Sequence, residues 1–134
     1  MGAKLLIDTD VLIDVSRGVR VAIAELDRLR TDYELATTVI TRMEMIVGCL
    51  NREDLEDLKR FLGVFQIVGM GERAAERAAA LLERYRLSHG LLIPDALIAG
   101  TAIANGLPLM TRNRRDFAFL EELSLFPCGY SIQS

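Results

Sequence analysis

The chain has 134 residues, of which 51% are hydrophobic and 26% are charged, a size and composition that fit one compact domain over residues 1–134 and exclude a disordered chain. No apolar stretch approaches the roughly 18 residues of a membrane span, and the N-terminus turns acidic at Asp8 before a signal sequence could form, so we expect a cytoplasmic protein with no membrane contact. The net charge of −3 argues against binding of nucleic acid through overall positive charge.

The first half of the chain alternates apolar runs with helical patterns. Residues 4–7 form a short, mainly apolar run that suits a buried strand, whose carboxyl end delivers Asp8 to the edge of a sheet. Thr41-Arg42-Met43-Glu44 matches a capping box and predicts that a helix starts at Thr41. The predicted elements, in chain order, are a strand at 4–7, helices at 11–16 and 19–29, a strand at 34–37, and helices at 41–48 and 52–62.

The second half continues this alternation. Pro94 suits the first turn of a helix because an N–H at that position would lack a helical partner in any case, and Asp95 then falls in the same turn. Gly106 suits the end of this helix, since glycine adopts the left-handed backbone common after helix ends. The predicted elements are a strand at 64–68, a helix at 72–87, a helix from Pro94 to residue 105, a strand at 107–111 and an edge strand at 124–126.

Strands separated by helices predict an α/β fold. Right-handed crossovers would produce a central parallel sheet covered by helices on both faces, which is a three-layer α/β/α arrangement. In open sheets of this kind, ligands bind outside the carboxyl ends of the strands, where Asp8 and the residues after Thr111 should lie. We also expect Glu44 and Asp95 in the first turns of their helices, so that these acids converge on the same edge.

Cysteine and histidine are too sparse for several common kinds of site. Cys49 and Cys128 lie far apart and lack the CxxC spacing of a zinc site, which fits a reducing compartment, and we expect both to be packing residues. His89 is the only histidine, so a Ser-His-Asp triad or a multi-histidine metal site has little to draw on. We expect His89 at a helix end.

Four acids are candidates for one shared site: Asp8, Glu44, Asp95 and Asp116. Each alone has an ordinary explanation as a cap, a turn residue or a partner of a helix dipole. Together they need a positive partner, because two carboxylates about 4 Å apart repel by roughly 4 kcal/mol at an effective dielectric constant near 20. The chain has only two lysines, Lys4 and Lys59, whereas Mg²⁺ or Mn²⁺ suits an all-oxygen site. We therefore expect a divalent metal and hydrolysis of a phosphodiester.

Four motifs resemble those of the PIN-domain family, and of VapC-type toxins within it. They are Leu5-Leu6-Ile7-Asp8-Thr9-Asp10-Val11-Leu12-Ile13-Asp14, Glu44, Pro94-Asp95-Ala96-Leu97-Ile98-Ala99 and Thr111-Arg112-Asn113-Arg114-Arg115-Asp116-Phe117. They span essentially the whole chain, in the order and spacing of the family. The resemblance implies a PIN-like fold and an endoribonuclease that requires Mg²⁺ or Mn²⁺. It also implies the toxin of a toxin–antitoxin pair, which forms a homodimer, acts on RNA and is held inactive by a small antitoxin.

Carried over position by position, the resemblance assigns Asp8, Glu44, Asp95 and Asp116 as catalytic and metal-binding residues. Asp8 and Asp95 would be the main metal ligands. Glu44 would bind the metal directly or through water, or would orient the attacking water. Asp116 would complete the outer edge of the site, and Asn113 could act in its place or beside it, because many relatives carry an acid or an asparagine there.

Several neighbouring residues leave alternatives open. Asp10 departs from the asparagine or serine common in the family, and its charge could strengthen metal binding or repel phosphate. Thr9 and Thr111 could orient carboxylates or could be turn residues. Asp14 is expected to pair with nearby arginines on a helix surface. The remaining candidates are Arg112, Arg114 and Arg115. These arginines could hold RNA phosphates, although a solvated, charge-balanced loop is favoured.

Three other functions compete with the metal-dependent ribonuclease. Asp8-Thr9-Asp10 also resembles the paired aspartates of haloacid-dehalogenase-like phosphatases, but those enzymes need a late lysine and a Gly-Asp motif, and this chain has no lysine after Lys59 and no Gly-Asp dipeptide. A catalytically silent module that binds RNA or protein is the second alternative, and the presence of all four acids argues against it. A cellular RNA-processing nuclease without an antitoxin is the third.

Overall fold

The computed structural model describes residues 2–131 of the chain. Within them, five strands form one sheet in which every pairing is parallel, so the predicted α/β class is confirmed. The strands are β1 Ala3–Ile7, β2 Tyr33–Thr38, β3 Gln66–Val68, β4 Leu109–Met110 and β5 Leu125–Phe126. The helices are α1 Thr9–Ser16, α2 Arg20–Leu29, α3 Val39–Val47, α4 Arg52–Leu62, α5 Glu72–His89 and α6 Ile93–Ala104, with a short 3₁₀ helix at Arg114–Asp116.

The strand order β3-β2-β1-β4-β5 places β1 in the centre of the sheet. Leu5 pairs with Leu35 of β2, and Ile7 pairs with Met110 of β4, so the carboxyl ends of these strands lie on one edge. The chain moves outwards from β1 through β2 to β3, and then returns to the other side of β1 at β4. This reversal of direction marks the position at which open parallel sheets have their binding crevice.

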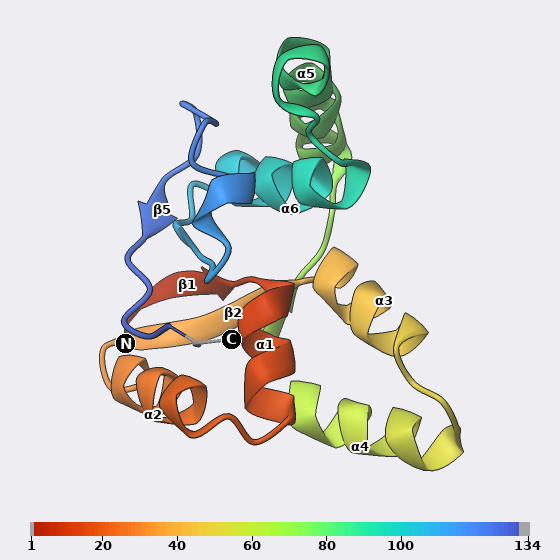
Figure 1. The fold of residues 1–134 in the computed structure, drawn as a ribbon, viewed down its shortest axis with the longest axis vertical. Helices are drawn as coiled ribbons and strands as arrows, with labels where there is room; N and C mark the ends of the chain where they lie inside the picture. The colour runs from red at the N-terminus through yellow and green to blue at the C-terminus, as the bar shows by residue number, and fades with distance from the viewer. Residues whose placement is uncertain (1, 132–134) are drawn as a thin grey trace.

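Two hydrophobic cores, one on each face of the sheet, hold the layers together. Figure 1 shows α5 and α6 above the sheet, with α1, α2 and α4 below it. Alternate side chains of β1 point to opposite faces: Leu6 packs with α5 and α6, whereas Leu5 and Ile7 pack with α1, α2 and α4. All three leucine and isoleucine side chains are fully buried. A strand that is covered on both faces has a continuous apolar sequence, and this pattern predicted β1.

Most predicted elements are confirmed with small shifts of their ends, but the start of α3 differs in a way that affects the site. The helix begins at Val39, and its cap is Thr38, whose side chain accepts a hydrogen bond from the backbone N–H of Thr41 at 3.0 Å. The predicted capping box at Thr41 is therefore wrong, and Glu44 does not lie in the first turn. The reason is that β2 leads directly into α3, so the last strand residue takes the capping position.

The other predicted helix ends agree with the structure. Pro94 and Asp95 lie in the first turn of α6, and Gly106 follows that helix with a left-handed φ of 64°. His89 is the last residue of α5. These signals are local in the chain, so they could be recognised without knowledge of the packing.

Both cysteines are free and half-buried, and both pack against the core on the α1 face of the sheet, as expected for packing residues. None of the helices within residues 2–131 is both long and apolar enough to span a membrane.

Candidate active site

The candidate site lies where β1 and β4 end side by side. Asp8 is the first residue after β1. Its backbone N–H donates to the carbonyl oxygen of Met110, the last residue of β4, at 2.9 Å. Thr111 follows β4, and its hydroxyl donates to Asp8 Oδ2 at 2.8 Å. Asp8 is only 6% exposed and Thr111 is fully buried. The sheet and the threonine hydroxyl together orient the Asp8 carboxylate.

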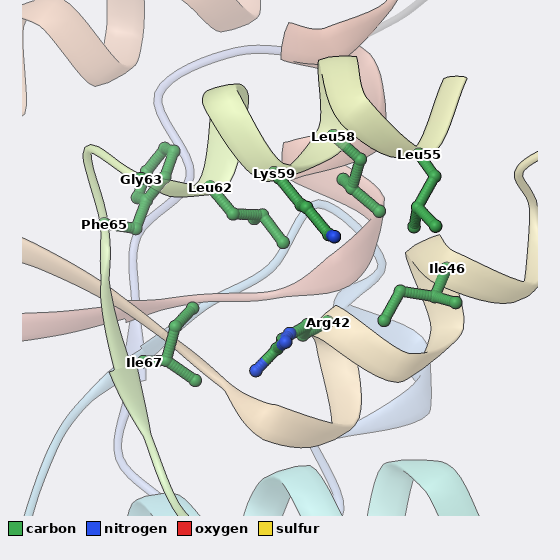
Figure 2. A pocket seen from close by; sticks show the side chains of 9 residues that line it. All are labelled: Arg42, Ile46, Leu55, Leu58, Lys59, Leu62, Gly63, Phe65 and Ile67. Atoms are coloured by element: carbon green, nitrogen blue, oxygen red, sulfur yellow. The ribbon is translucent and has the colours of Figure 1, made fainter. Parts of the chain in front are cut away.

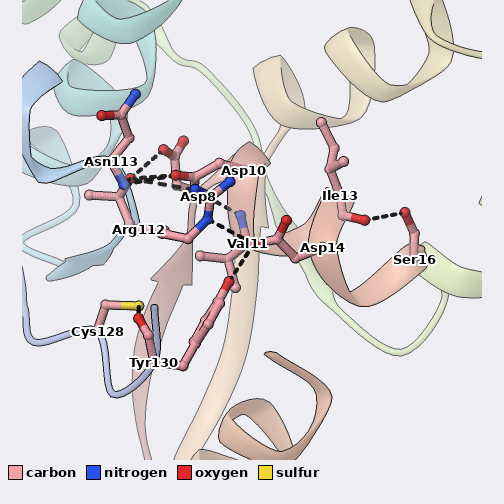
Figure 3. Close-up of polar contacts among 11 residues, drawn as sticks. Asp8, Asp10, Val11, Ile13, Asp14, Ser16, Arg112, Asn113, Cys128 and Tyr130 are labelled. Carbon is pink, nitrogen blue, oxygen red and sulfur yellow. Dashed lines mark hydrogen bonds and ion pairs between the residues drawn. The ribbon is translucent and has the colours of Figure 1, made fainter. Parts of the chain in front are cut away.

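Asp10 lies in the first turn of α1, beside the loop that follows β4 (Figure 3). Its Oδ2 accepts a hydrogen bond from the backbone N–H of Asn113 at 2.8 Å and lies 3.3 Å from the Thr111 hydroxyl. Thr111 also accepts from the Asn113 N–H at 3.1 Å, so it serves as a turn residue as well as an orienting one. Asp10 therefore ties the loop at 111–113 to α1.

Glu44 reaches the same edge from α3. The Thr9 hydroxyl donates to Glu44 Oε1 at 2.8 Å, and its oxygen lies 2.9 Å from the hydroxyl oxygen of Thr41. Thr9 thus connects α1 to α3, in agreement with the interpretation that it orients a carboxylate. Thr41 is a residue that the sequence analysis did not place in the site. Its position three residues before Glu44, on the same helix face, was the available signal.

Asp95 and Asp116 complete the group of acids. Burial raises the pKa of Asp95 to about 6, and the charges of neighbouring acids add to the effect. Those acids, in decreasing order of influence, are Asp116, Glu44 and Asp10. Asp116 lies at the end of the 3₁₀ helix and accepts a hydrogen bond from Asn113 Nδ2 at 2.6 Å. Asn113 and Asp116 therefore act as a pair, which the sequence analysis left open.

The electrostatic cost of gathering these acids is greatest at Asp8. Burial raises the pKa of Asp8 to about 8, the charge of Asp10 adds to this, and Asp95 makes a smaller contribution in the same direction. The hydrogen bond from Thr111 partly opposes the shift, because it stabilises the ionised form. Near neutral pH, Asp8 therefore favours either a proton or a nearby cation.

The acids approach one another without forming a closed metal site. Among the side chains of residues 2–131, no three Asp, Glu, His or Cys groups stand in a geometry that could already hold a metal ion. Repulsion between carboxylates is strong at short range when no positive charge separates them. The donors nevertheless fit a hard divalent cation in their chemistry, since they are carboxylate oxygens with hydroxyl and amide groups beside them.

Asp14 is the site neighbour that the sequence analysis placed wrongly. It is 6% exposed, and its Oδ2 accepts hydrogen bonds from Arg112 Nε at 2.9 Å and from the Tyr130 hydroxyl at 2.8 Å (Figure 3). The sequence predicts a pairing with nearby arginines on a helix surface; the arginine partner is present, but Asp14 is buried. Its actual partners come from segments 98 and 116 residues away in the chain, so local spacing could not reveal them. Arg114 and Arg115 are exposed, as the solvated-loop alternative predicted.

Two cavities border α4, and they differ in their relation to the acids. Figure 2 shows one of about 270 Å³ between α3 and α4, which has Arg42 and Lys59 at its edge and no acid among the described residues that line it. The other, of about 470 Å³, lies between α1, α3 and α4 and is bordered by Glu44, with Met45 and Phe61 among its apolar walls. Of the two, the second adjoins the candidate site.

A parallel sheet with acids outside the carboxyl ends of its central strands defines a class of α/β protein whose site lies at that edge of the sheet. Comparison with protein families makes the assignment specific. The family described as "PIN domain" matches residues 5–122. The chain belongs to the PIN-domain family, and the resemblance noted in its motifs is confirmed.

Individual relatives agree with this assignment. The chain is 38% identical over 120 residues to "Ribonuclease VapC10" of Mycobacterium tuberculosis, and the match covers 89% of this chain and 90% of that protein. It is 33% identical over 125 residues to "Ribonuclease VapC1" of Methanocaldococcus jannaschii, covering 92% and 85% respectively. A solved toxin–antitoxin complex from Klebsiella pneumoniae matches with a TM-score of 0.77 and 34% identity, over 96% of this chain and 99% of that chain.

Proposed function

We propose that this chain is a divalent-metal-dependent endoribonuclease and the toxin of a toxin–antitoxin pair. The observation that carries the proposal is the gathering of acids from four separate segments at one sheet edge, where their charges act on one another. Asp8 and Asp95 come from different elements, and both have a pKa well above that of an ordinary carboxyl group. The similar proteins that are named ribonucleases support RNA as the substrate.

Each acid has a role that follows from its position. Asp8 and Asp95 would hold Mg²⁺ or Mn²⁺, because burial disfavours their ionised forms and a nearby cation would stabilise those forms. Glu44, held at one oxygen by Thr9, would orient the attacking water. Asp116, held by Asn113, would close the outer edge. When bound, the ion supplies Lewis acidity that offsets the charge developing on the phosphodiester during hydrolysis.

The proposed protein partners are a small antitoxin and a second copy of the chain. The similar structure from Klebsiella pneumoniae is a toxin–antitoxin complex, and an antitoxin that silences this chain must cover its acids. The cavity bordered by Glu44 offers apolar contacts beside them. Exposed apolar side chains at the start of α6, Leu92 and Ile93, would be covered by a second copy. The free cysteines fit a reducing cytoplasm.

The proposal is tested by cleavage of a mixture of structured RNAs with the purified chain in Mg²⁺, in Mn²⁺ and in excess chelator. We expect cleavage with either metal and none in chelator. Asp95→Asn should lower the rate by about 100-fold, because it keeps the size of the side chain and removes a charged ligand. Asp27→Asn is the matched control, since Asp27 is an exposed acid on α2, and it should cleave like the parent.

Cleavage that persists in chelator, or in both Asp8→Asn and Asp95→Asn, would contradict the proposed site. Absence of cleavage by clean, metal-loaded protein without antitoxin would instead support the silent binding module. Titration with Mn²⁺ by calorimetry would then decide whether the acids bind a cation at all.

A further inference from the structure

Tyr130 joins the C-terminal segment to the helix that follows the central strand (Figure 3). Its hydroxyl donates to Asp14 Oδ2 at 2.8 Å, and Arg112 Nε donates to the same oxygen at 2.9 Å. Asp14 is buried, so these two donors replace the water that would otherwise solvate its charge. A single carboxylate oxygen thus connects α1, the loop after β4 and the end of the described chain.

The segment that carries Tyr130 is docked at a second point. The backbone N–H of Gly129 donates to the carboxylate of Glu25 on α2, and a Cβ at Gly129 would overlap that carboxylate. Glu25 is itself buried and accepts two hydrogen bonds from Arg28, at 2.9 and 3.0 Å. The position of the Tyr130 hydroxyl is therefore determined by packing against two helices.

Arg112 lies in the middle of the loop that orients the acids. On one side of it, Thr111 donates to Asp8 at 2.8 Å. On the other side, the Asn113 side chain donates to Asp116 at 2.6 Å. Residues 111–113 lie outside any helix or strand, so side-chain contacts must hold this backbone in place. Whatever fixes Arg112 therefore also fixes the donors on either side of it.

Asp10 and Asp14 are four residues apart on α1 and so lie on the same face of the helix. Asp10 accepts from the backbone N–H of Asn113 at 2.8 Å, and Asp14 accepts from Arg112. We propose that Asp14, Arg112 and Tyr130 are positioning residues, which clamp the loop at 111–113 to α1 and thereby set the orientation of the acids. The clamp itself is inferred from these contacts alone. Its effect on metal binding and RNA cleavage rests on the proposed function.

The contacts give Arg112 a structural partner. An arginine that binds substrate phosphate needs its guanidinium directed towards the substrate. Here, Nε of Arg112 is committed to a buried carboxylate, and the side chain is 36% exposed. Arg114 and Arg115 are exposed as well, and neither of them forms an ion pair with another described residue. The Nε contact of Arg112 thus supports a positioning role through the loop.

The clamp is tested first by amide hydrogen exchange in metal-free protein, which needs neither metal nor RNA. Tyr130→Phe removes only a hydroxyl, and Arg112→Gln removes the charge while the buried Asp14 stays in place. Both should speed exchange of the Asn113 amide by about tenfold, the effect expected when a hydrogen bond to a charged group is lost.

The control variants remove the same two groups from contacts with carboxylates elsewhere in the fold. Tyr85→Phe removes a hydroxyl that donates to Glu122 at 2.8 Å, and Arg84→Gln removes a guanidinium that pairs with Glu121 at 3.1 Å. Both lie on α5, and neither should change exchange at Asn113. Faster exchange in these controls as well would mean that the effect is general destabilisation, and it would overturn the clamp.

The consequence for the acids is tested by Mn²⁺ binding, measured by calorimetry below the unfolding temperature of each variant. Tyr130→Phe and Arg112→Gln should bind Mn²⁺ about tenfold more weakly, as expected when residues behind metal ligands are removed. Arg112→Lys keeps one donor and should recover part of the affinity. The Mn²⁺ concentration for half-maximal RNA cleavage should rise in parallel.

The outcomes separate this inference from the proposed function. Unchanged exchange in both variants would overturn the clamp. Faster exchange with unchanged Mn²⁺ affinity would overturn its effect on the acids. A parent protein that neither binds Mn²⁺ nor cleaves RNA would refute the proposed function, while faster exchange in the variants would still support the clamp.

Discussion

Asp8 is subject to two opposing requirements. It follows the central strand, so the same packing that buries β1 also removes water from its carboxyl group. Burial favours the protonated form, whereas the metal ligand that we propose Asp8 to be must be ionised. The Thr111 hydroxyl offsets part of this conflict by donating to Oδ2. Asp95 meets the same conflict in a weaker form, because it is only half-buried. In metal-free protein, both acids therefore take up protons at a higher pH than they would in an unfolded chain.

Metal-free protein should lose stability as the pH rises. The folded-state pKa values of Asp8 and Asp95, about 8 and about 6, lie above the value near 4 expected in the unfolded chain. The folded state therefore binds more protons, and this contribution is fully present below about pH 4 and is lost as the pH rises through 6 and then 8. Thermal unfolding in chelator between about pH 5 and pH 9 measures the loss.

Asp8→Asn and Asp95→Asn should each flatten this decline, and Asp27→Asn should not, because Asp27 is exposed on α2. A melting temperature of the parent that rises with pH over the same range would mean that the two acids are not protonated as described.

At the scale of the elements, the approach of α6 to α5 determines where Asp95 lies. Gly100, in the middle of α6, makes this approach possible, because a Cβ there would lie 2.7 Å from the carbonyl oxygen of Ala74 and 2.9 Å from the backbone nitrogen of Ala78. Both alanines are buried on α5. The alanine-rich sequence of α5, which predicted a strong helix, therefore also provides the small side chains needed at the contact.

Gly100→Ala should destabilise the protein by about 1–3 kcal/mol, because the added methyl group overlaps backbone atoms that cannot rotate away. This outweighs the gain of about 1 kcal/mol that alanine brings within a helix. Gly69→Ala is the control, since a Cβ there meets open space, and it should change stability by less than about 0.5 kcal/mol. Urea unfolding measures both. A Gly100→Ala variant as stable as the parent would show that the two helices can separate freely.

At the scale of the whole molecule, the acids of the candidate site come together only when the chain folds. Its acids lie at positions 8, 44, 95 and 116, and each is brought to the sheet edge by a different element. An unfolded chain does not bring these groups together, so a cation that binds them binds the folded state. Cation binding and global stability are therefore linked.

Mn²⁺ or Mg²⁺ should raise the melting temperature of the parent. An ion present at 100 times its Kd stabilises the folded state by about 2.7 kcal/mol. The effect should be larger at pH 8 than at about pH 5, where protons compete for the same carboxylates. Differential scanning calorimetry with and without the ion measures it, and K⁺ at equal ionic strength is the control. An equal rise in Asp95→Asn would mean that the ion binds elsewhere.

The sequence by itself determined the α/β class and the order of the elements, and it singled out four acids as candidates for one site. It did so because apolar periodicity, helix caps and glycine or proline signals act over a few residues, as at the strand before Asp8, at Pro94 and at Gly106. Parallel pairing follows from the alternation of strands and helices, and it places the acids on one edge. The motif resemblance added the family, which the comparison with known families confirmed.

Only the tertiary structure decided how these acids are held. It replaced Thr41 with Thr38 as the cap of α3, buried Asp14 against Arg112 and Tyr130, and paired Asn113 with Asp116. The two contacts of Asp14 join segments 98 and 116 residues apart in the chain, whereas the other two are local and depend on the exact backbone path. Burial and the sum of neighbouring charges, which raise the pKa values at the site, exist only once the layers have packed together.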